Sequence, residues 1–191
     1  NTPKSLAEKF LKDVQKPGRY TGGELNSTIK DKEKIKARFA FCFPDAYEIG
    51  MSNLGMRILY GVLNREEDVL CERVYAPWTD MEEQMRLHSL PLFTHESGDA
   101  VSSFDIVAFT LQYELCYSNV LNMLELAKIP LRSADRGEDC PLVIGGGPCA
   151  YNPEPVADFF DLFNIGEGEE MLPEIVRLYI KMKDDGTYTR A

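Results

Sequence analysis

Five apolar segments alternate with stretches of helical periodicity along most of the chain. Three of the segments are nearly continuous in apolar residues, which is typical of parallel strands that are covered on both faces. The second segment is more polar, so it is expected nearer an edge of the sheet. The five segments are ARFAFCF at 37–43, DVLCERVYAP at 68–77, DIVAFTLQ at 105–112, PLVIG at 141–145 and DLFNI at 161–165.

Helical spacing of apolar residues follows these strands. Gly55, Ile58, Leu59 and Val62 fall at i, i+3, i+4 and i+7, which predicts a helix after the first strand. Further helices are expected over 79–88 and 117–128, in the short segment VADFF, and over a last segment near the end of the chain. That last helix has an apolar stripe made of Leu172, Ile175, Val176, Tyr179 and Ile180.

Alternation of strand and helix, repeated five times, predicts an α/β fold. Parallel strands need helical crossovers, so the expected architecture is a flavodoxin-like (Rossmann-like), doubly wound five-stranded parallel sheet. Five strands favour the order 2-1-3-4-5, although the sequence alone does not fix the order. Ligands of such sheets bind beyond the carboxyl ends of the strands, so the loops after the strands are the candidate functional segments.

The N-terminal part of the chain has a different character. A helix is expected over 5–16, with Ser5 and Glu8 as a capping box. The segment KPGRYTGGELNST that follows is rich in glycine and turn-forming residues, and an irregular insertion near residue 90 leaves room for an extra strand at 91–94. The predicted parts are a helix and glycine-rich arm packing on the domain (1–37), the α/β domain (38–183) and a polar tail (184–191).

Composition excludes several classes of protein. The 191 residues carry a net charge of −10 and no stripe of basic residues, which argues against direct nucleic-acid binding. No apolar run approaches the roughly 20 residues of a membrane span, and no signal-peptide core is visible, so a cytoplasmic chain without membrane contact is expected. Five cysteines without C-x-x-C spacing and two histidines without an H-E-x-x-H pattern indicate neither a disulfide framework nor a metal site.

The loops after the strands do not match the common phosphate-binding motifs. Gly166-Glu167-Gly168 lacks the third glycine of a dinucleotide-binding turn, and the neighbouring carboxylates would repel a phosphate. A P-loop needs Lys followed by Ser or Thr, which is absent. Thr110 stands where a phospho-receiver domain would have its acceptor aspartate. The triplet Gly145–Gly147 instead favours close approach of a bulky flat ligand to the backbone, although a tight turn would explain one of these glycines.

The ordered set FPDAYEIGMSNLG, FTLQYE, GGGPCAYNPEP and IGEGEE resembles the N-terminal domain of cobalamin-binding-domain radical S-adenosylmethionine (SAM) proteins. Asp45-Ala-Tyr47-Glu-Ile-Gly50 is similar to the D-x-H-x-x-G loop of cobalamin-binding domains, with Tyr47 in place of the histidine. The resemblance covers roughly residues 16–180 and is specific as an ordered set rather than in any single motif.

The resemblance implies a cobalamin-binding module. Because a phenol with a pKa near ~10 is a poor cobalt ligand, it implies a base-off cobalamin without histidine ligation. The dimethylbenzimidazole tail would enter between the loops after the first, third and fourth strands. No C-x-x-x-C-x-x-C motif occurs, so S-adenosylmethionine and a four-iron–four-sulfur cluster would belong to a radical SAM barrel in the same parent chain.

The resemblance also names the residues expected at the cofactor. Asp45 would orient its neighbours by hydrogen bonds, and Gly50 would let the chain turn beside the tail. Either Tyr47 or a water would cover the lower corrin face. The expected cofactor-binding residues are Asp45, Tyr47, Glu48, Gly50, Met51, Ser52, Thr110, Leu111, Gln112, Tyr113, Gly145, Gly146, Gly147, Pro148, Gly166, Glu167 and Gly168.

Two other functions remain open on the sequence. The missing histidine is consistent with a degenerate cobalamin fold that serves as a scaffold or interaction domain. A small hydrolase or transferase using Asp45, Glu48 and Glu114 is a weaker alternative, because the sequence offers no nucleophile with a placed base. On the cofactor interpretation, this chain alone would not turn over a substrate.

Overall fold

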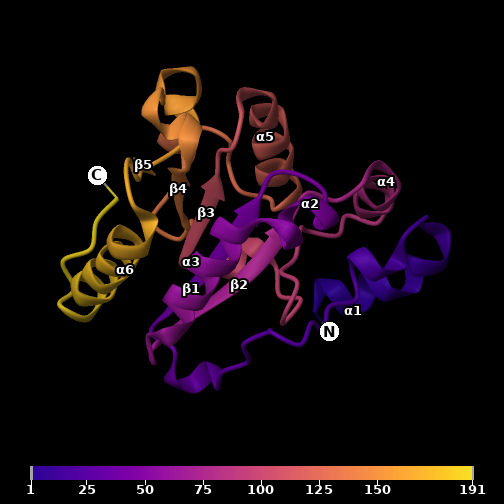
Figure 1. The fold of residues 1–191 in the computed structure, drawn as a ribbon, viewed down its shortest axis with the longest axis horizontal. Coiled ribbons are helices and arrows are strands. Elements are labelled where there is room, and N and C mark those ends of the chain that lie inside the picture. The colour runs from indigo at the N-terminus through magenta and orange to yellow at the C-terminus, as the bar shows by residue number, and fades with distance from the viewer. Residues whose placement is uncertain (1, 191) are drawn as a thin grey trace.

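A five-stranded, all-parallel sheet forms the centre of the computed structural model, which describes residues 2–190 (Figure 1). Its order is β2-β1-β3-β4-β5, so the predicted flavodoxin-like arrangement and strand order are confirmed. As the apolar runs predict, β1 and β3 are almost entirely buried. The strands are β1 (Ala37–Phe43), β2 (Val69–Tyr75), β3 (Ile106–Thr110), β4 (Leu142–Gly146) and β5 (Leu162–Phe163).

Helices cover both faces of the sheet, which places one apolar core on each side. On one face, α3 (Leu54–Arg65) and α6 (Gly168–Asp184) pack on inward-facing strand residues such as Phe39 and Ile106. On the other face, α4 (Thr79–Leu87) and α5 (Tyr117–Leu126) pack on the alternate strand residues. The short helix α2 (Tyr47–Ser52) follows β1 directly and precedes α3.

The more polar segment does form an edge strand, β2, as expected, yet all of its residues are buried. The N-terminal arm covers this edge. The hydroxyl of Tyr60 accepts a hydrogen bond from the Thr28 backbone N–H at 2.7 Å, and the Lys30 ammonium donates to the carbonyls of Glu66 and Val69 at 2.5 Å. Covering an exposed edge in this way removes a template for unwanted strand pairing.

The N-terminal helix differs from its prediction over 5–16. The α-helix α1 spans Pro3–Ala7 and continues as a 3₁₀-helix over Glu8–Asp13. Its cap is Thr2 rather than Ser5, because the Thr2 side chain accepts from the Ser5 backbone N–H at 3.3 Å and the Ser5 hydroxyl donates back to the Thr2 carbonyl. Ser5 therefore lies inside the first turn, and the Ser5–Glu8 capping box is wrong.

Three shorter segments are also less regular than predicted. The expected strand at 91–94 is a single antiparallel bridge between Phe93 and Ala100. The helix in VADFF is a 3₁₀-helix over Glu154–Phe159. The polar end of the chain folds back on the domain, where the Arg190 guanidinium donates to the Pro141 carbonyl at 2.5 Å. None of the helices within residues 2–190 is long and apolar enough to cross a membrane.

Candidate functional site

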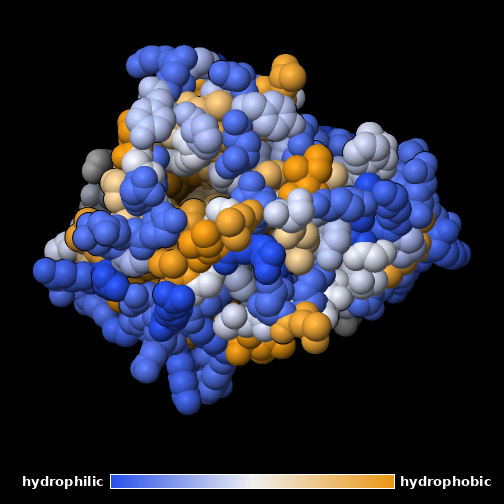
Figure 2. Space-filling model, in the orientation of Figure 1, coloured by the Kyte–Doolittle hydropathy of each residue, from blue (hydrophilic) through white to orange (hydrophobic). Residues whose placement is uncertain are grey.

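A cavity of about 290 Å³ opens at the carboxyl ends of β1, β3 and β4, on the face of the sheet that α3 and α6 cover. The space-filling view shows a hollow in the surface in this part of the molecule (Figure 2). This is the position at which open parallel sheets bind their ligands, because loops from neighbouring strands meet there. We call this cavity the rim pocket.

The floor of the rim pocket is apolar and comes from three strands in register. Phe41 on β1 pairs with Ala108 on β3, which in turn pairs with Ile144 on β4. Leu59 of α3 and Leu172 of α6 form the walls. Because Ala108 has the smallest side chain of this set, the floor is lowest at the centre of the sheet, where a flat apolar group fits.

Polar side chains lie above this floor, at the ends of β1 and β3. Asn53 begins α3, and its Oδ1 accepts from the Met56 backbone N–H at 2.8 Å, an ordinary helix cap. After β3, the Gln112 side-chain amide donates to the Thr110 hydroxyl. These polar groups therefore already have partners within the protein.

Three consecutive glycines, Gly145 and Gly146 at the end of β4 and Gly147 directly after it, are present for different structural reasons. A Cβ atom at Gly145 would lie 2.8 Å from the Phe163 ring, and Gly147 has a φ of 94°, which L-residues rarely adopt. A Cβ atom at Gly146 would come no closer than 3.8 Å to its nearest neighbour, Asn164. Packing and backbone conformation thus require Gly145 and Gly147, whereas the missing side chain of Gly146 leaves space inside the rim pocket.

Asn164, which directly follows β5, is the unusual polar residue of the rim pocket. Its backbone N–H donates to the Gly145 carbonyl at 2.8 Å and its surface is only 5% exposed. The side-chain Oδ1 is buried and has no hydrogen-bond partner within residues 2–190. An unpaired buried acceptor costs about 1–3 kcal/mol, so it needs a reason.

Acidic residues line the side of the rim pocket where α6 begins. Glu167 caps this helix without a side-chain hydrogen bond, and Glu169 lies in its first turn. Their carboxylates offset the positive end of the helix dipole. This side of the pocket therefore disfavours a bare phosphate and suits a neutral group.

A second polar cluster lies beneath the N-terminal arm, around Tyr47. The Tyr47 hydroxyl donates to Glu24 Oε1 at 2.9 Å, and His95 Nε2 lies 2.5 Å from the same oxygen. Burial and this carboxylate raise the pKa of Tyr47 to about 12. The Tyr47 ring also packs edge-on against Tyr75. We call this set, together with Arg73, the arm cluster.

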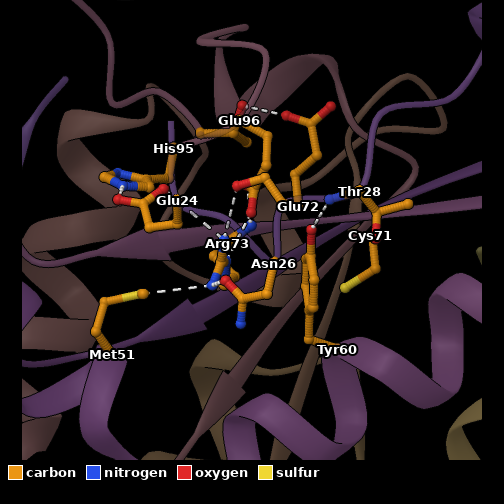
Figure 3. Close-up of polar contacts among 12 residues, drawn as sticks. Glu24, Asn26, Thr28, Met51, Tyr60, Cys71, Glu72, Arg73, His95 and Glu96 are labelled. Atoms are coloured by element: carbon orange, nitrogen blue, oxygen red, sulfur yellow. Dashed lines mark hydrogen bonds and ion pairs between the residues drawn. The ribbon is translucent and has the colours of Figure 1, made fainter. Parts of the chain in front are cut away.

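Arg73 of β2 stands at the centre of the arm cluster (Figure 3). Its side chain is only 1% exposed, and its Nε donates to Glu96 Oε1 at 2.6 Å. Asn26 and Ser27 of the arm accept further hydrogen bonds from the guanidinium. The arm cluster is thus a closed network that fastens the arm to the sheet edge, with only about 30 Å³ of space beside Tyr47 and His95.

The comparisons with known proteins bear on this arrangement. The family model described as "Radical SAM proteins, N-terminal" matches residues 55–191. The chain belongs to this family. The match includes β3, β4 and the start of α6, and with them most of the residues that form the rim pocket.

This radical SAM N-terminal domain is also similar to the uncharacterized protein MJ0966 of Methanocaldococcus jannaschii, at 22% identity over 160 residues. The aligned part is 82% of this chain and 30% of that protein, so the chain spans less than a third of its relative. No solved structure matches the chain.

The radical SAM N-terminal domain brings together one part of the residues expected at the cofactor. The loops after β3, β4 and β5 all meet at the rim pocket, as their place at the carboxyl ends predicts. The expected residues that line it are Thr110, Gln112, Gly146, Gly147, Gly166, Glu167 and Gly168.

The loop after β1 contributes little to the rim pocket, although the sequence pointed to it first. Asp45 accepts from the Tyr113 hydroxyl at 2.7 Å, and Gly50 packs so tightly that a Cβ atom would lie 2.5 Å from the Tyr75 ring. Glu48 pairs with Lys16 and Arg19 of the arm, which lowers its pKa to about 2. These residues, with Tyr47, hold the arm and helix α2 in place.

The remaining expected residues also lie outside the pocket lining. Leu111 is fully buried, and its backbone N–H donates to the Gly146 carbonyl at 2.7 Å. Met51 places its sulfur 2.8 Å from the Tyr75 hydroxyl, and the Ser52 hydroxyl donates to the Ile49 carbonyl. Gly145 and Pro148 shape the backbone around β4 and its 3₁₀ turn.

Several pocket residues were not predicted. Ala108 and Leu59 looked like ordinary core residues, and Asn164 looked like part of a strand. An Asn at the end of an apolar segment, directly before Gly-Glu-Gly, was the one available signal for Asn164. Among residues 2–190, no group of three or more His, Cys, Asp or Glu side chains is placed to hold a metal ion.

Proposed function

We propose that this domain binds cobalamin in a base-off form for a radical SAM enzyme, with the nucleotide tail in the rim pocket. The observation that carries the proposal is a cavity kept open in the middle of the sheet. Protein cores are close-packed, whereas here the small residues Ala108 and Gly146 leave space that a larger side chain at either position would enter. An apolar floor with a few convergent polar groups is typical of a small-molecule site.

The chemical character of the rim pocket supports the base of the tail as its occupant. A flat aromatic base matches the floor of Phe41, Ala108 and Ile144. The acids Glu167 and Glu169 favour a neutral group over a phosphate at the α6 side. The buried Oδ1 of Asn164 has no partner in residues 2–190, so the pocket also offers a hydrogen-bond acceptor to an occupant that carries a donor.

Tyr47 supports the base-off form without a protein ligand on cobalt. Burial and Glu24 raise the pKa of its phenol to about 12, and the hydroxyl donates a hydrogen bond to Glu24 beneath the arm. For Tyr47 to serve as a ligand to cobalt, its hydrogen bond within the arm cluster would have to break. On this proposal the chain binds and orients the cofactor, and the cofactor supplies the reactive metal.

The other parts of the proposal concern the parent protein. The chain spans 30% of its relative MJ0966, so we place a radical SAM barrel, with S-adenosylmethionine and a four-iron–four-sulfur cluster, in the remainder of the parent chain. We further propose that the protein works in the cytoplasm, without membrane or direct nucleic-acid contact by this domain, and that the isolated domain has no turnover.

The test is retention of hydroxocobalamin after desalting, read from the visible spectrum. The wild-type chain should keep the corrinoid with a base-off spectrum. Gly146→Leu should lose it, because its side chain enters the rim pocket. Gly137→Leu is the matched control, since Gly137 is exposed and a Cβ atom there meets nothing within 4 Å.

The same test decides the alternative of a scaffold domain. The observation that favours a scaffold is that Tyr47, which stands at the position of the cobalt-ligating histidine in the resembled family, is held by Glu24 of the arm. If all the corrinoid passes through the column with folded wild-type protein, the cofactor proposal fails and the scaffold interpretation takes its place.

A further inference from the structure

We infer that Asn164 makes the rim pocket selective for a tail whose base carries a hydrogen-bonding edge, such as an exocyclic amine. This inference rests on the proposed function and goes one step further, because it specifies the chemistry of the buried base. It starts from a difference in hydrogen bonding: the other uncharged polar side chains of the pocket have partners in the protein, whereas the Asn164 Oδ1 has none in residues 2–190.

The other uncharged polar side chains near the rim pocket are accounted for within the protein. Asn53 caps α3 through the Met56 N–H, and Gln112 donates to Thr110. Asn164 is about as buried as a core residue, yet its Oδ1 has no partner in the described part of the chain. A fold that needed only packing there would be as well served by Leu, because a same-shaped apolar residue avoids the desolvation cost.

The position of the Asn164 amide connects it to the ligand space. The Asn164 Nδ2 lies 4.0 Å from a Cβ placed at Gly146 and 3.7 Å from a Cβ placed at Gly168. The amide therefore lies between the glycine that opens the pocket and the glycine that begins α6. A base inserted over Gly146 meets this amide along one edge.

The chemistry of the amide then predicts a preference. A side-chain amide both accepts and donates, so it pairs with an edge that carries an amine beside a ring nitrogen, as in adenine. The dimethyl edge of dimethylbenzimidazole offers neither group. A site built to hydrogen-bond a ligand discriminates against an analogue that lacks the group. We expect the adenine-containing analogue of cobalamin to bind roughly 5- to 100-fold more tightly than cobalamin itself.

The experiment compares three corrinoids by equilibrium titration of the wild-type chain. They are cobalamin, its analogue with adenine as the lower base, and cobinamide, which has no nucleotide. The expected order of affinity is the adenine analogue, then cobalamin, then cobinamide. The variant Asn164→Leu should lose the preference for adenine, so that its affinities for the adenine analogue and for cobalamin become equal. Asn152→Leu, the same change at an exposed position of the neighbouring loop, should keep the wild-type order.

The outcomes separate this inference from the proposal on which it rests. Equal binding of cobalamin and the adenine analogue, with weaker cobinamide binding, would overturn the role of Asn164 and leave the cofactor proposal intact. Cobinamide binding as tightly as both, or no corrinoid binding at all, would overturn the proposed function. The wild-type comparison decides the question even if Asn164→Leu does not fold.

Discussion

The rim pocket and the arm cluster both contain polar residues at or beside the carboxyl ends of neighbouring strands, but they have opposite character. In the arm cluster, Arg73, Glu96 and Glu24 Oε1 have partners at close range and almost no free space remains. The second oxygen of Glu24 is buried without a hydrogen bond in residues 2–190, but the Arg73 guanidinium lies 3.9 Å from it. In the rim pocket, about 290 Å³ stays open and the Asn164 Oδ1 has no partner in residues 2–190.

This difference indicates that, within the one ordered set of motifs, the residues of the arm cluster stabilise the fold and those of the rim pocket are available for a ligand. A polar network that fastens a segment finds most of its partners, including opposite charges, within the protein itself, and breaking it is costly. A pocket with an unpaired polar group carries an unfavourable term that a ligand can relieve. Within the first motif, Tyr47 belongs to the arm cluster, whereas Asn53 and Gly55 line the rim pocket together with residues of the later three motifs.

The largest effect should follow from breaking the arm cluster at Arg73. Arg73→Met leaves Glu96 buried without its cation, so the free energy of unfolding should fall by about 3–5 kcal/mol. Denaturant unfolding measures this loss. Arg177→Met is the control, because its ion pair with Glu66 is exposed and is worth less than about 1 kcal/mol. Similar losses for both variants would show that the arm cluster is not a buried network.

Two glycines sharpen the comparison. In Gly50→Ala the new methyl group meets the Tyr75 ring at 2.5 Å, so stability should fall by about 1–3 kcal/mol. In Gly146→Ala the methyl group has ordinary contact distances, and stability should stay within about 0.5 kcal/mol of the wild type. Thermal and denaturant unfolding of the two variants are compared directly. Equal destabilisation would mean that the rim pocket is as tightly packed as helix α2.

Replacing a polar residue of the rim pocket by an apolar one should not lower the free energy of unfolding, in contrast to Arg73→Met in the arm cluster. Asn164→Leu removes an unpaired buried acceptor, so the ligand-free chain should be as stable as the wild type or more stable by up to about 1–2 kcal/mol. The midpoint of denaturant unfolding tests this expectation. A loss of more than about 1 kcal/mol would show that the Asn164 amide serves the fold rather than a ligand.

The smallest expected effect is a pH dependence of stability that comes from Glu24 of the arm. Burial alone would raise the pKa of Glu24, but hydrogen bonds from His95 and Tyr47 outweigh it and hold the pKa below the ordinary 4.5. A carboxylate with a lowered folded pKa contributes stability above the unfolded pKa and loses it as the pH falls through the folded pKa. The stability of the wild type should therefore fall below about pH 4.5 more steeply than that of Glu24→Gln, as unfolding at several pH values would show. Parallel curves would contradict this assignment.

The fold was largely predictable because hydrophobic periodicity dominates it. The parallel sheet is predicted directly by the apolar runs of β1, β3 and β4 and by the apolar stripes of α3 and α6. The N-terminal segment was less predictable. Its first turn depends on the hydrogen bond from Ser5 to Thr2, and its arm depends on contacts with Tyr60 and Arg73, which are distant in sequence.

The site was predictable only from the rule that ligands of parallel sheets bind beyond the carboxyl ends of the strands. That rule placed Thr110, Gln112 and Gly146 together, because the ends of neighbouring parallel strands share one rim. It could not show that Tyr47 turns toward Glu24 and away from the pocket, since Glu24 comes from an arm without regular structure. Nor could it show that Ala108 sets the depth of the floor, because that depends on register with Phe41 and Ile144.

The most direct test of the account is amide hydrogen exchange of the chain with and without cobalamin. Binding in the rim pocket should slow exchange in peptides covering 108–112, 144–147 and 164–169, with little change at 45–52, because the arm cluster is closed in both states. Slower exchange at 45–52 and in the arm, with no change around Gly146 and Asn164, would contradict the assignment of the ligand to the rim pocket.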